Sequence, residues 1–255
     1  MPKTLLFLDT ETTSKEGRMI QLAYKPSTES KCEVFFYKNP EPITIGAMAT
    51  HHITEEMLSS YPPLEQESEH RSALVKLFNG MTIVAHNSPF DVAVLAREGF
   101  EIAPDSVIDT LQVAKHLLPG LESYSLQYLR YYFGCTFPEQ INPHDAESDV
   151  IVLEAVFNRL ALLTAEKYGF GPEEVAKDEP GLIEEKMIEL TNTPILLKLI
   201  PLGKHKGEKF DVVMVQDRQW LNWLDDQDWV DGDLKYTLQY WLTGKYKDEV
   251  QPKLI

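Results

Sequence analysis

The chain has 255 residues, 43% of them hydrophobic, which is enough for one full core and a smaller second unit. Two cysteines are too few for a disulfide framework, and the apolar run at residues 5–8 stops at Asp9, so we expect a soluble, cytoplasmic protein that does not enter a membrane. The net charge of −16 argues against a protein that coats nucleic acid with a basic surface, although bound divalent ions would still allow nucleic acid at one acidic site.

The first part of the chain predicts an α/β fold. Short apolar runs predict strands at residues 4–8, 18–25, 33–37, 81–85 and 106–110, of which the first three form an antiparallel meander. Helical periodicity and helix-start signals predict helices at residues 68–79, 89–99, 126–133 and 146–167. We therefore expect one α/β domain over residues 1–167.

The rest of the chain differs in composition. Residues 168–199 begin with a stretch rich in Gly, Pro and acids and predict a linker with a helical segment at 182–191. Residues 200–255 predict a small C-terminal module with a possible nucleic-acid contact, and this module contains every tryptophan. We interpret its aromatic residues as a small core, with base stacking as the less favoured alternative. The same packing role is predicted for four tyrosines in and just before the 126–133 helix: Tyr124, Tyr128, Tyr131 and Tyr132.

Two acids, Asp9 and Glu11, follow the first predicted strand. Side chains two apart in a strand share a face, so these carboxylates project together if the strand continues through them. Adjacent carboxylates repel each other, and hard oxygen ligands favour Mg²⁺ or Mn²⁺. On this motif alone, a solvated strand edge or a helix cap is the more common interpretation, and metal binding is the less common one.

Two further motifs carry acids after a strand or at the start of a helix. In AHNSPFD (residues 85–91), Asp91 is either a site residue or a partner of the helix dipole, and His86 and Asn87 are candidate helix caps. In PHDAESD (residues 143–149), His144 and Asp149 lie five apart, which is about 140° on a helix, so one regular helix cannot point both inward. We expect Asp149 on the helix and His144 at or before its start.

Taken together, the segments FLDTETT, AHNSPFD and HDAESD resemble, in the same order, the motifs of the DEDDh branch of the DnaQ-like 3′-to-5′ exonuclease superfamily. ATHHITEEML (residues 49–58) is similar to a further segment of that family, with His52 where the family has glycine. The resemblance covers about residues 3–165 and implies a ribonuclease H-like fold, a five-stranded mixed sheet flanked by helices. The Gly-Lys-His-Lys-Gly loop and the tryptophan-bearing segments after it resemble the small module that follows the nuclease domain in exodeoxyribonuclease X-like proteins.

The resemblance also implies a mechanism. Asp9, Glu11 and Asp149 would bind one divalent ion, Asp9 and more remotely Asp91 would serve a second, and His144 would be the general base. The expected cofactors are two Mg²⁺ or Mn²⁺ ions, and the expected reaction releases 5′ mononucleotides from DNA 3′ ends, single-stranded or double-stranded.

Six residues are candidates for substrate contact. Thr12, Thr13 and His51 match family positions near the terminal nucleotide, although as Thr and His they are equally good caps or surface residues; Asn87 lies in the second motif. Lys204 and Lys206 concentrate positive charge in the C-terminal module and are candidates for phosphate contact, with a solvated turn as the alternative.

Two other functions stay open at this point. An RNA-trimming 3′-to-5′ exoribonuclease would use the same residues and differ in contacts to the 2′-hydroxyl, so RNA is an alternative partner. A catalytically silent nucleic-acid-binding protein on the same fold is the second alternative. The sequence does not distinguish a monomer from a homodimer.

Overall fold

The computed structural model describes residues 4–138, 141–170 and 181–245, and the chain divides into two compact units between Asn192 and Thr193. Each unit has its own hydrophobic core. No helix in these described ranges is long and apolar enough to cross a membrane.

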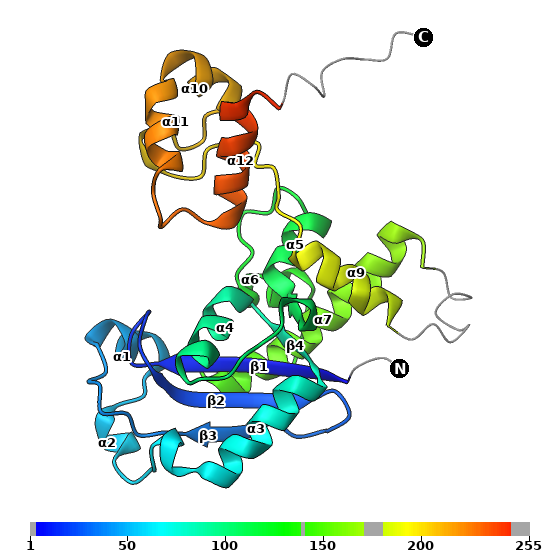
Figure 1. The fold of residues 1–255 in the computed structure, drawn as a ribbon. Coiled ribbons are helices and arrows are strands. Elements are labelled where there is room, and N and C mark those ends of the chain that lie inside the picture. The colour runs from blue at the N-terminus through cyan, green and yellow to red at the C-terminus, as the bar shows by residue number, and fades with distance from the viewer. Residues whose placement is uncertain (1–3, 139–140, 171–180, 246–255) are drawn as a thin grey trace. The chain divides into compact units, whose positions relative to one another are not determined.

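The first unit is built on one five-stranded sheet. In chain order its strands are β1 (Leu5–Thr12), β2 (Met19–Pro26), β3 (Glu33–Phe36), β4 (Thr82–Ala85) and β5 (Val107–Asp109). The spatial order is β3-β2-β1-β4-β5, and Figure 1 labels the first four of these strands. β2 is antiparallel to both β3 and β1, whereas β4 is parallel to both β1 and β5. The predicted ribonuclease H-like mixed sheet with flanking helices is therefore confirmed.

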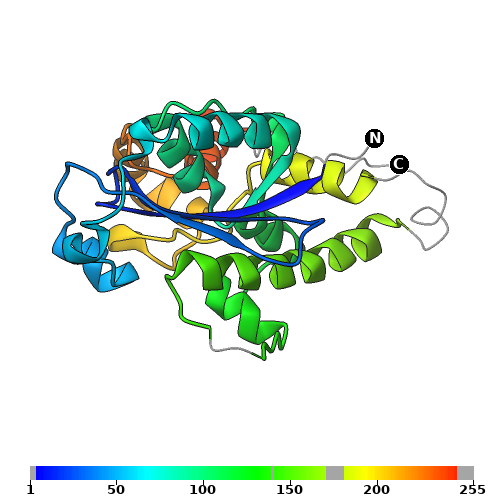
Figure 2. The ribbon, with the colours of Figure 1, turned by 90° about the horizontal axis from the view of Figure 1, so that it is seen from below.

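Helices cover both faces of the sheet (Figure 2). In the first unit they are α1 (Ile45–His51), α2 (Glu55–Leu58), α3 (Ser68–Gly80), α4 (Ser88–Arg97), α5 (Thr110–Leu117), α6 (Leu126–Tyr132), α7 (Ala146–Tyr168) and α9 (Leu182–Thr191), with 3₁₀ turns η1 (Leu64–Gln66) and η2 (Pro104–Ser106). The sequence did not predict α1 and α2, which are too short for a periodic pattern. Thr44 and Thr54 begin them, because their hydroxyls accept from the N–H groups of Ala47 and Met57.

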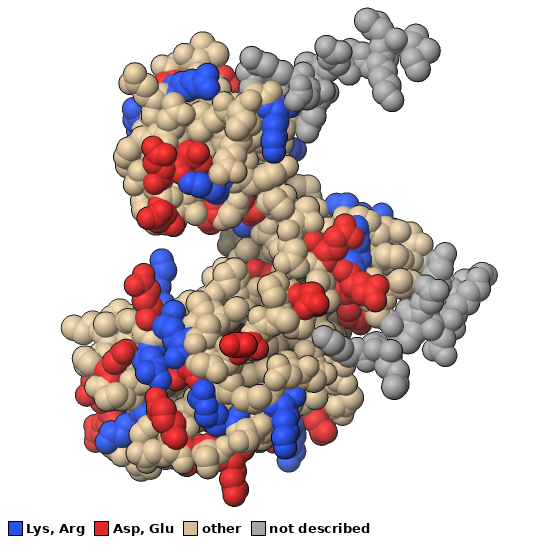
Figure 3. All heavy atoms as spheres, in the orientation of Figure 1, with Lys and Arg blue, Asp and Glu red and all other residues tan. Residues whose placement is uncertain are grey.

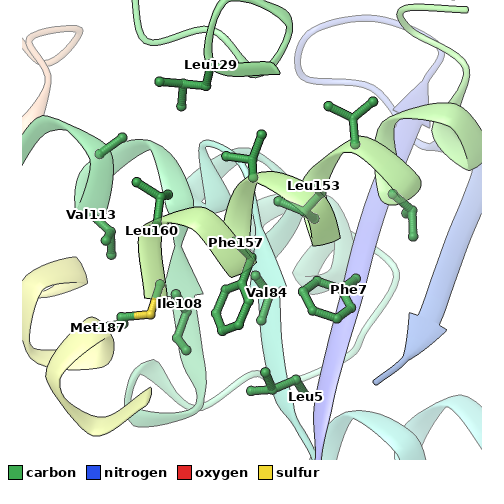
Figure 4. Packing of buried hydrophobic residues seen from close by; sticks show 14 of the residues in the cluster. Leu5, Phe7, Val84, Ile108, Val113, Leu129, Leu153, Phe157, Leu160 and Met187 are labelled. Atoms are coloured by element: carbon green, nitrogen blue, oxygen red, sulfur yellow. The ribbon is translucent and has the colours of Figure 1, made fainter. Parts of the chain in front are cut away.

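Successive side chains of β1 point to opposite faces of the sheet and therefore lie in two different cores. Leu5 and Phe7 lie in the core beneath α7, while Leu6 and Leu8 lie in the core beneath α3 and α4. Figure 4 shows the first of these cores, where the rings of Phe7 and Phe157 meet edge to face with their centroids 5.4 Å apart. This packing fixes the position of the carboxyl end of β1 relative to α7.

Helix α9 lies within the segment predicted as a linker, yet it packs into the first unit. Met187 and Leu190 are buried in the core beneath α7, and the Thr191 hydroxyl accepts a hydrogen bond of 2.9 Å from the Asp109 N–H. Residues 171–180 of the predicted linker lie outside the described residues. The structure therefore shows that α9 packs against the core of the first unit. The predicted domain bounds at residues 167, 199 and 255 stay a prediction.

Over its described residues, 193–245, the second unit contains η3 (Gly203–His205) and the helices α10 (Phe210–Gln216), α11 (Arg218–Asp225) and α12 (Gly232–Thr243). Its core includes Phe210, Leu221 and Leu238, and Trp220 and Trp241 pack against that core. Trp223 and Trp229 are instead 51% and 60% exposed. The prediction of a small aromatic core is confirmed for Trp220 and Trp241 and is wrong for Trp223 on α11 and for Trp229 in the turn after it, which are both exposed.

Candidate active site

Asp9 and Glu11 lie near the carboxyl end of β1. They follow Leu5 and Phe7 at intervals of two, so they face the α7 side of the sheet. Both are half-buried, and the strand continues regularly through them until its register with β2 shifts between Glu11 and Thr12. The predicted same-face arrangement of the two carboxylates is thus present in the structure.

Asp91 approaches from α4. Its side chain is only 3% exposed, and its Oδ1 accepts a hydrogen bond of 2.7 Å from the Thr10 hydroxyl on β1. Burial, and to a smaller extent the charge of Asp109, raises the pKa of Asp91 to about 7. Asp91 is therefore more than a helix-dipole partner, because a buried carboxylate tied to β1 is costly unless something compensates its charge.

The turn before α4 is held by backbone geometry. Asn87 has a left-handed backbone (φ 66°), and its N–H donates to Asp109 Oδ1 at 2.9 Å, but its side chain does not cap the helix. His86 does not cap it either, since its ring bonds the Thr110 hydroxyl and the Tyr124 carbonyl. Asn87 itself is exposed, so its predicted substrate contact stays a prediction.

Asp149 lies in the first turn of α7 with both carboxylate oxygens engaged. Oδ1 accepts from the Gln127 side chain and Oδ2 from the His144 backbone N–H, each at 2.9 Å. His144 stands before the helix with a left-handed backbone (φ 62°) and an exposed side chain. The structure therefore places these two residues as the spacing predicted, with Asp149 inward on the helix and His144 on the segment before it.

The carboxylates act on one another electrostatically. The pKa of Asp9 is raised well above its usual value by burial and by the charges of Asp91, Asp149, Glu11 and Asp145, in that order. Burial, followed by the charges of Asp149, Asp91 and Asp145, raises the pKa of Glu11 to about 8. Burial also raises the pKa of Asp149. We refer to Asp9, Glu11, Asp91, Asp145 and Asp149 as the acidic cluster.

The acidic cluster fits divalent metal ions by its chemistry. Its members are hard oxygen donors whose mutual repulsion and burial a cation would relieve. In the arrangement seen, no group of three or more His, Cys, Asp or Glu side chains among the described residues is close enough to hold a metal ion. The carboxylates thus surround the end of β1 without converging on one point.

Three residues of this region were missed by sequence reasoning. Asp145 caps α7, accepting from the Ser148 N–H and hydroxyl, and Asp109 caps α5 through Leu111. Gln127 holds Asp149 from α6. The sequence marks Asp109 and Asp145 as possible helix N-caps, but a capping pattern does not show that they also lie near other acids.

Thr12 ends β1, Thr13 begins the turn that follows it, and His51 at the end of α1 contacts this turn. The His51 Nε2–H donates to the Thr12 carbonyl at 3.1 Å, and its Nδ1 accepts from the Ile53 N–H at 3.0 Å. The Thr12 hydroxyl donates to the Ser14 carbonyl, and the Thr13 hydroxyl donates to Glu41. All three are buried, so they shape this turn, and their predicted contact with substrate would need one of these bonds to be exchanged.

Lys204 and Lys206 lie in the second unit. Lys204 Nζ pairs with Asp217 at 2.5 Å, and the neighbouring His205 lies between Glu208 and Asp217 at 2.9 and 3.0 Å. Gly203 is required by this loop, because it has a positive φ of 72° and a Cβ there would lie 2.7 Å from the Trp220 ring. Lys206 is exposed. Figure 3 likewise shows Lys and Arg beside Asp and Glu on its visible face.

Comparison with known proteins gives relatives among exonucleases. Exodeoxyribonuclease 10 of Escherichia coli strain K12 is 25% identical over 243 residues, which covers 93% of this chain and 98% of the relative. A DNA polymerase III subunit epsilon-like protein of Rhodobacter capsulatus is 30% identical over 169 residues, covering 62% of this chain and 23% of that protein.

Solved structures of exonucleases share the fold. Exonuclease X in complex with 5′ overhanging duplex DNA has a TM-score of 0.52 at 24% identity and covers 73% of this chain and 99% of its own. E. coli Exonuclease I in complex with an oligonucleotide has a TM-score of 0.53 at 22% identity and covers 66% of this chain and 43% of its own. Because the model of the RNase_T family, described as exonuclease, matches residues 6–157, this chain belongs to that family and is a 3′-to-5′ exonuclease of the DnaQ-like superfamily.

Proposed function

We propose that this protein is a metal-dependent 3′-to-5′ exodeoxyribonuclease that releases 5′ mononucleotides from DNA. The observation that carries the proposal is the acidic cluster, in which buried or half-buried carboxylates raise one another's pKa at the end of β1 in a chain of the exonuclease family. The full-length alignment with exodeoxyribonuclease 10 supports DNA as the substrate.

Asp9, Glu11, Asp91 and Asp149 would hold the two ions. When bound, such ions stabilise the charge that develops on the scissile phosphate and lower the pKa of water. Gln127 and the His144 N–H fix the orientation of the Asp149 carboxylate, while Thr10 fixes that of Asp91. Two of the four proposed ligands, Asp91 and Asp149, are thus held by hydrogen bonds from neighbouring elements.

His144 is suited to take the proton from the attacking water. Its side chain is exposed, whereas its backbone is tied to Asp149, so the ring lies beside the cluster and can turn toward a substrate. The charge of His144 also acts on Asp149, which is consistent with their proximity. Imidazole is the side chain best suited to accept a proton at neutral pH and return it to solvent.

The test is digestion of oligonucleotides labelled at either the 3′ or the 5′ end, as DNA and RNA and as single and double strands, with Mg²⁺, with Mn²⁺ and with a chelator. The proposal predicts stepwise loss of 5′ mononucleotides from DNA 3′ ends that stops with the chelator. Faster digestion of RNA would assign the protein as an exoribonuclease. Binding of oligonucleotides without hydrolysis under any condition would overturn the proposal in favour of a catalytically silent protein.

A further inference from the structure

Helix α6 has one face in the core and one face in solvent. Leu129 is buried beneath α7, with Leu126 and Phe133 packed beside it. On a helical wheel of about 100° per residue, the opposite side carries, in angular order, Gln127, Tyr131, Tyr128 and Tyr132 over about 140°. The side of α6 that faces away from the core therefore carries Gln127 and three tyrosines, of which Tyr131 and Tyr132 are exposed and Tyr128 is partly buried.

These tyrosines do not pack as predicted from their spacing. Tyr131 is 73% and Tyr132 is 50% exposed, so the prediction of packing against the core is wrong for both. The rings of Tyr128 and Tyr132 are nearly parallel, at 14° with centroids 6.5 Å apart. The Arg130 guanidinium lies 5.2 Å from the centre of the Tyr131 ring. Exposed aromatic rings gathered on one face are typical of an interaction surface.

The tyrosine face is continuous with the acidic cluster. Gln127 donates to Asp149, and Tyr131 stands one turn further along α6, rotated by only about 40°. A ring at that position lies about 6 Å along the helix axis from the residue that holds a proposed metal ligand. A substrate strand with its 3′ end at Asp149 would pass this helix face.

We propose that Tyr131, together with Tyr128 and Tyr132, stacks against nucleobases of the substrate strand that lie upstream of the scissile phosphodiester. The inference rests on the proposed function. Tyrosine rings bind any base through its flat face, and a neutral aromatic surface with one adjacent guanidinium avoids the repulsion that the acidic chain imposes on phosphates. Three tyrosines on a seven-residue helix are too small a surface for a stable second copy of the chain.

The experiment measures kcat/KM on single-stranded DNA oligonucleotides that carry one abasic site, moved stepwise upstream from the 3′ end. If bases stack on α6, an abasic site at one or two upstream positions lowers kcat/KM of the wild type by about tenfold. In Tyr131→Ala, kcat/KM on the intact oligonucleotide is already lower by a similar factor. Adding the abasic site then lowers kcat/KM little further. Tyr131→Phe keeps the ring and restores the wild-type pattern.

Tyr168→Ala is the matched control, because Tyr168 is another exposed tyrosine at the far end of α7, about 28 Å along the helix from Asp149. In Tyr168→Ala, an abasic site should lower kcat/KM as much as it does in the wild type; we call this loss of kcat/KM the abasic penalty. The inference is overturned if the abasic penalty in Tyr131→Ala equals that of the wild type, or if Tyr131→Ala dissociates a dimer seen by sedimentation.

The nitrophenyl ester of thymidine 5′-monophosphate separates this inference from the proposed function. The ester has no upstream base, so it reports the acidic cluster alone. A wild-type protein that hydrolyses neither the ester nor any oligonucleotide counts against the proposed function. A wild type that hydrolyses both, with abasic penalties unchanged by Tyr131→Ala, counts against the tyrosine face alone.

Discussion

The two charged regions of this chain are built differently. At the end of β1, Asp9 and Glu11 lie within the fields of Asp91, Asp145 and Asp149, and repulsion and burial raise the pKa of both. In the C-terminal unit, Lys204 and His205 contact Asp217, whose pKa these contacts lower to about 2. One region contains acids whose mutual repulsion a bound cation would relieve, whereas the other pairs its charges internally.

This difference distinguishes a cluster of charges that binds a ligand from a cluster that stabilises a loop, which the sequence alone does not do. A cluster of like charges that is costly in the folded protein points to a ligand of opposite charge. A cluster of paired charges stabilises the shape of a loop and leaves less charge for a ligand. We therefore assign chemistry to the first region and, at most, substrate affinity to the second.

The largest effect is expected for Asp9→Asn. The variant keeps the side-chain shape but removes a proposed metal ligand, so kcat should fall by at least about a thousandfold. The metal-free variant should be no less stable to urea than the wild type, because it loses repulsion. Asp105→Asn, at an exposed loop acid, is the control. If kcat of Asp9→Asn stayed within tenfold of the wild-type value, Asp9 would not be a metal ligand of the active site.

His144→Ala should lower kcat by about a hundredfold or more while KM changes little, because a general base acts in the transition state. Steady-state kinetics on a DNA oligonucleotide measure both constants. The backbone N–H that holds Asp149 remains in the variant. Equal effects on kcat and KM would assign His144 to substrate binding instead.

Gln127→Ala should lower both metal affinity and kcat by about 10- to 100-fold, because it frees one oxygen of Asp149 from its hydrogen bond. Calorimetric titration with Mn²⁺ gives the affinity without turnover. Gln127→Glu, which is nearly isosteric but repels Asp149, should be at least as impaired. Unchanged metal affinity in both variants would show that Asp149 needs no orientation from α6.

The stability of the metal-free protein should rise as the pH falls from about 8 toward 6. Glu11 titrates at about 8 and Asp91 at about 7 in the folded protein, above their ordinary values of 4.5 and 3.8, so the folded state binds more protons than the unfolded state across this range. Urea unfolding in the presence of a chelator measures this trend. Glu11→Gln should make stability depend less on pH in this range. A wild-type stability that decreases as the pH falls from about 8 to 6 would contradict the assigned repulsion.

The smallest effect is expected in the C-terminal unit. Lys206→Glu should raise KM for DNA by about three- to tenfold without changing kcat, because Lys206 is exposed and would contact phosphate at most. Lys204→Glu is a less specific test of phosphate contact, since this substitution also breaks the ion pair between Lys204 and Asp217. Lys198→Glu, at another exposed lysine, is the control, and an equal effect there would indicate only general charge repulsion.

Local periodicity predicted the parts of the site that depend on one element. Strand alternation placed Asp9 and Glu11 on one face, and helix rotation separated His144 from Asp149. Asp109, Asp145 and Gln127 could not be found in this way. Their roles depend on which elements meet in space, and a capping aspartate looks the same beside an acidic cluster as beside water.

Amphipathic spacing failed on α6 for a related reason. Tyr128, Tyr131 and Tyr132 share a helix face, and a shared face of aromatic residues usually lies in a core. Here Leu126, Leu129 and Phe133 already fill the core side, so Tyr131 and Tyr132 remain in solvent and Tyr128 is only partly buried. Helix α9 was interpreted as part of a linker because its sequence context is rich in Gly and Pro, while its contacts with β5 and α7 are long-range.

The most direct test of the account is calorimetric titration of Mn²⁺ into the full-length wild type and into Asp9→Asn, Glu11→Gln and Asp105→Asn. The account predicts binding to the wild type and to Asp105→Asn that is lost or strongly weakened in the two β1 variants. Equal binding by all four proteins, or none by the wild type, would contradict the claim that the acidic cluster at the end of β1 is the metal site of this exonuclease.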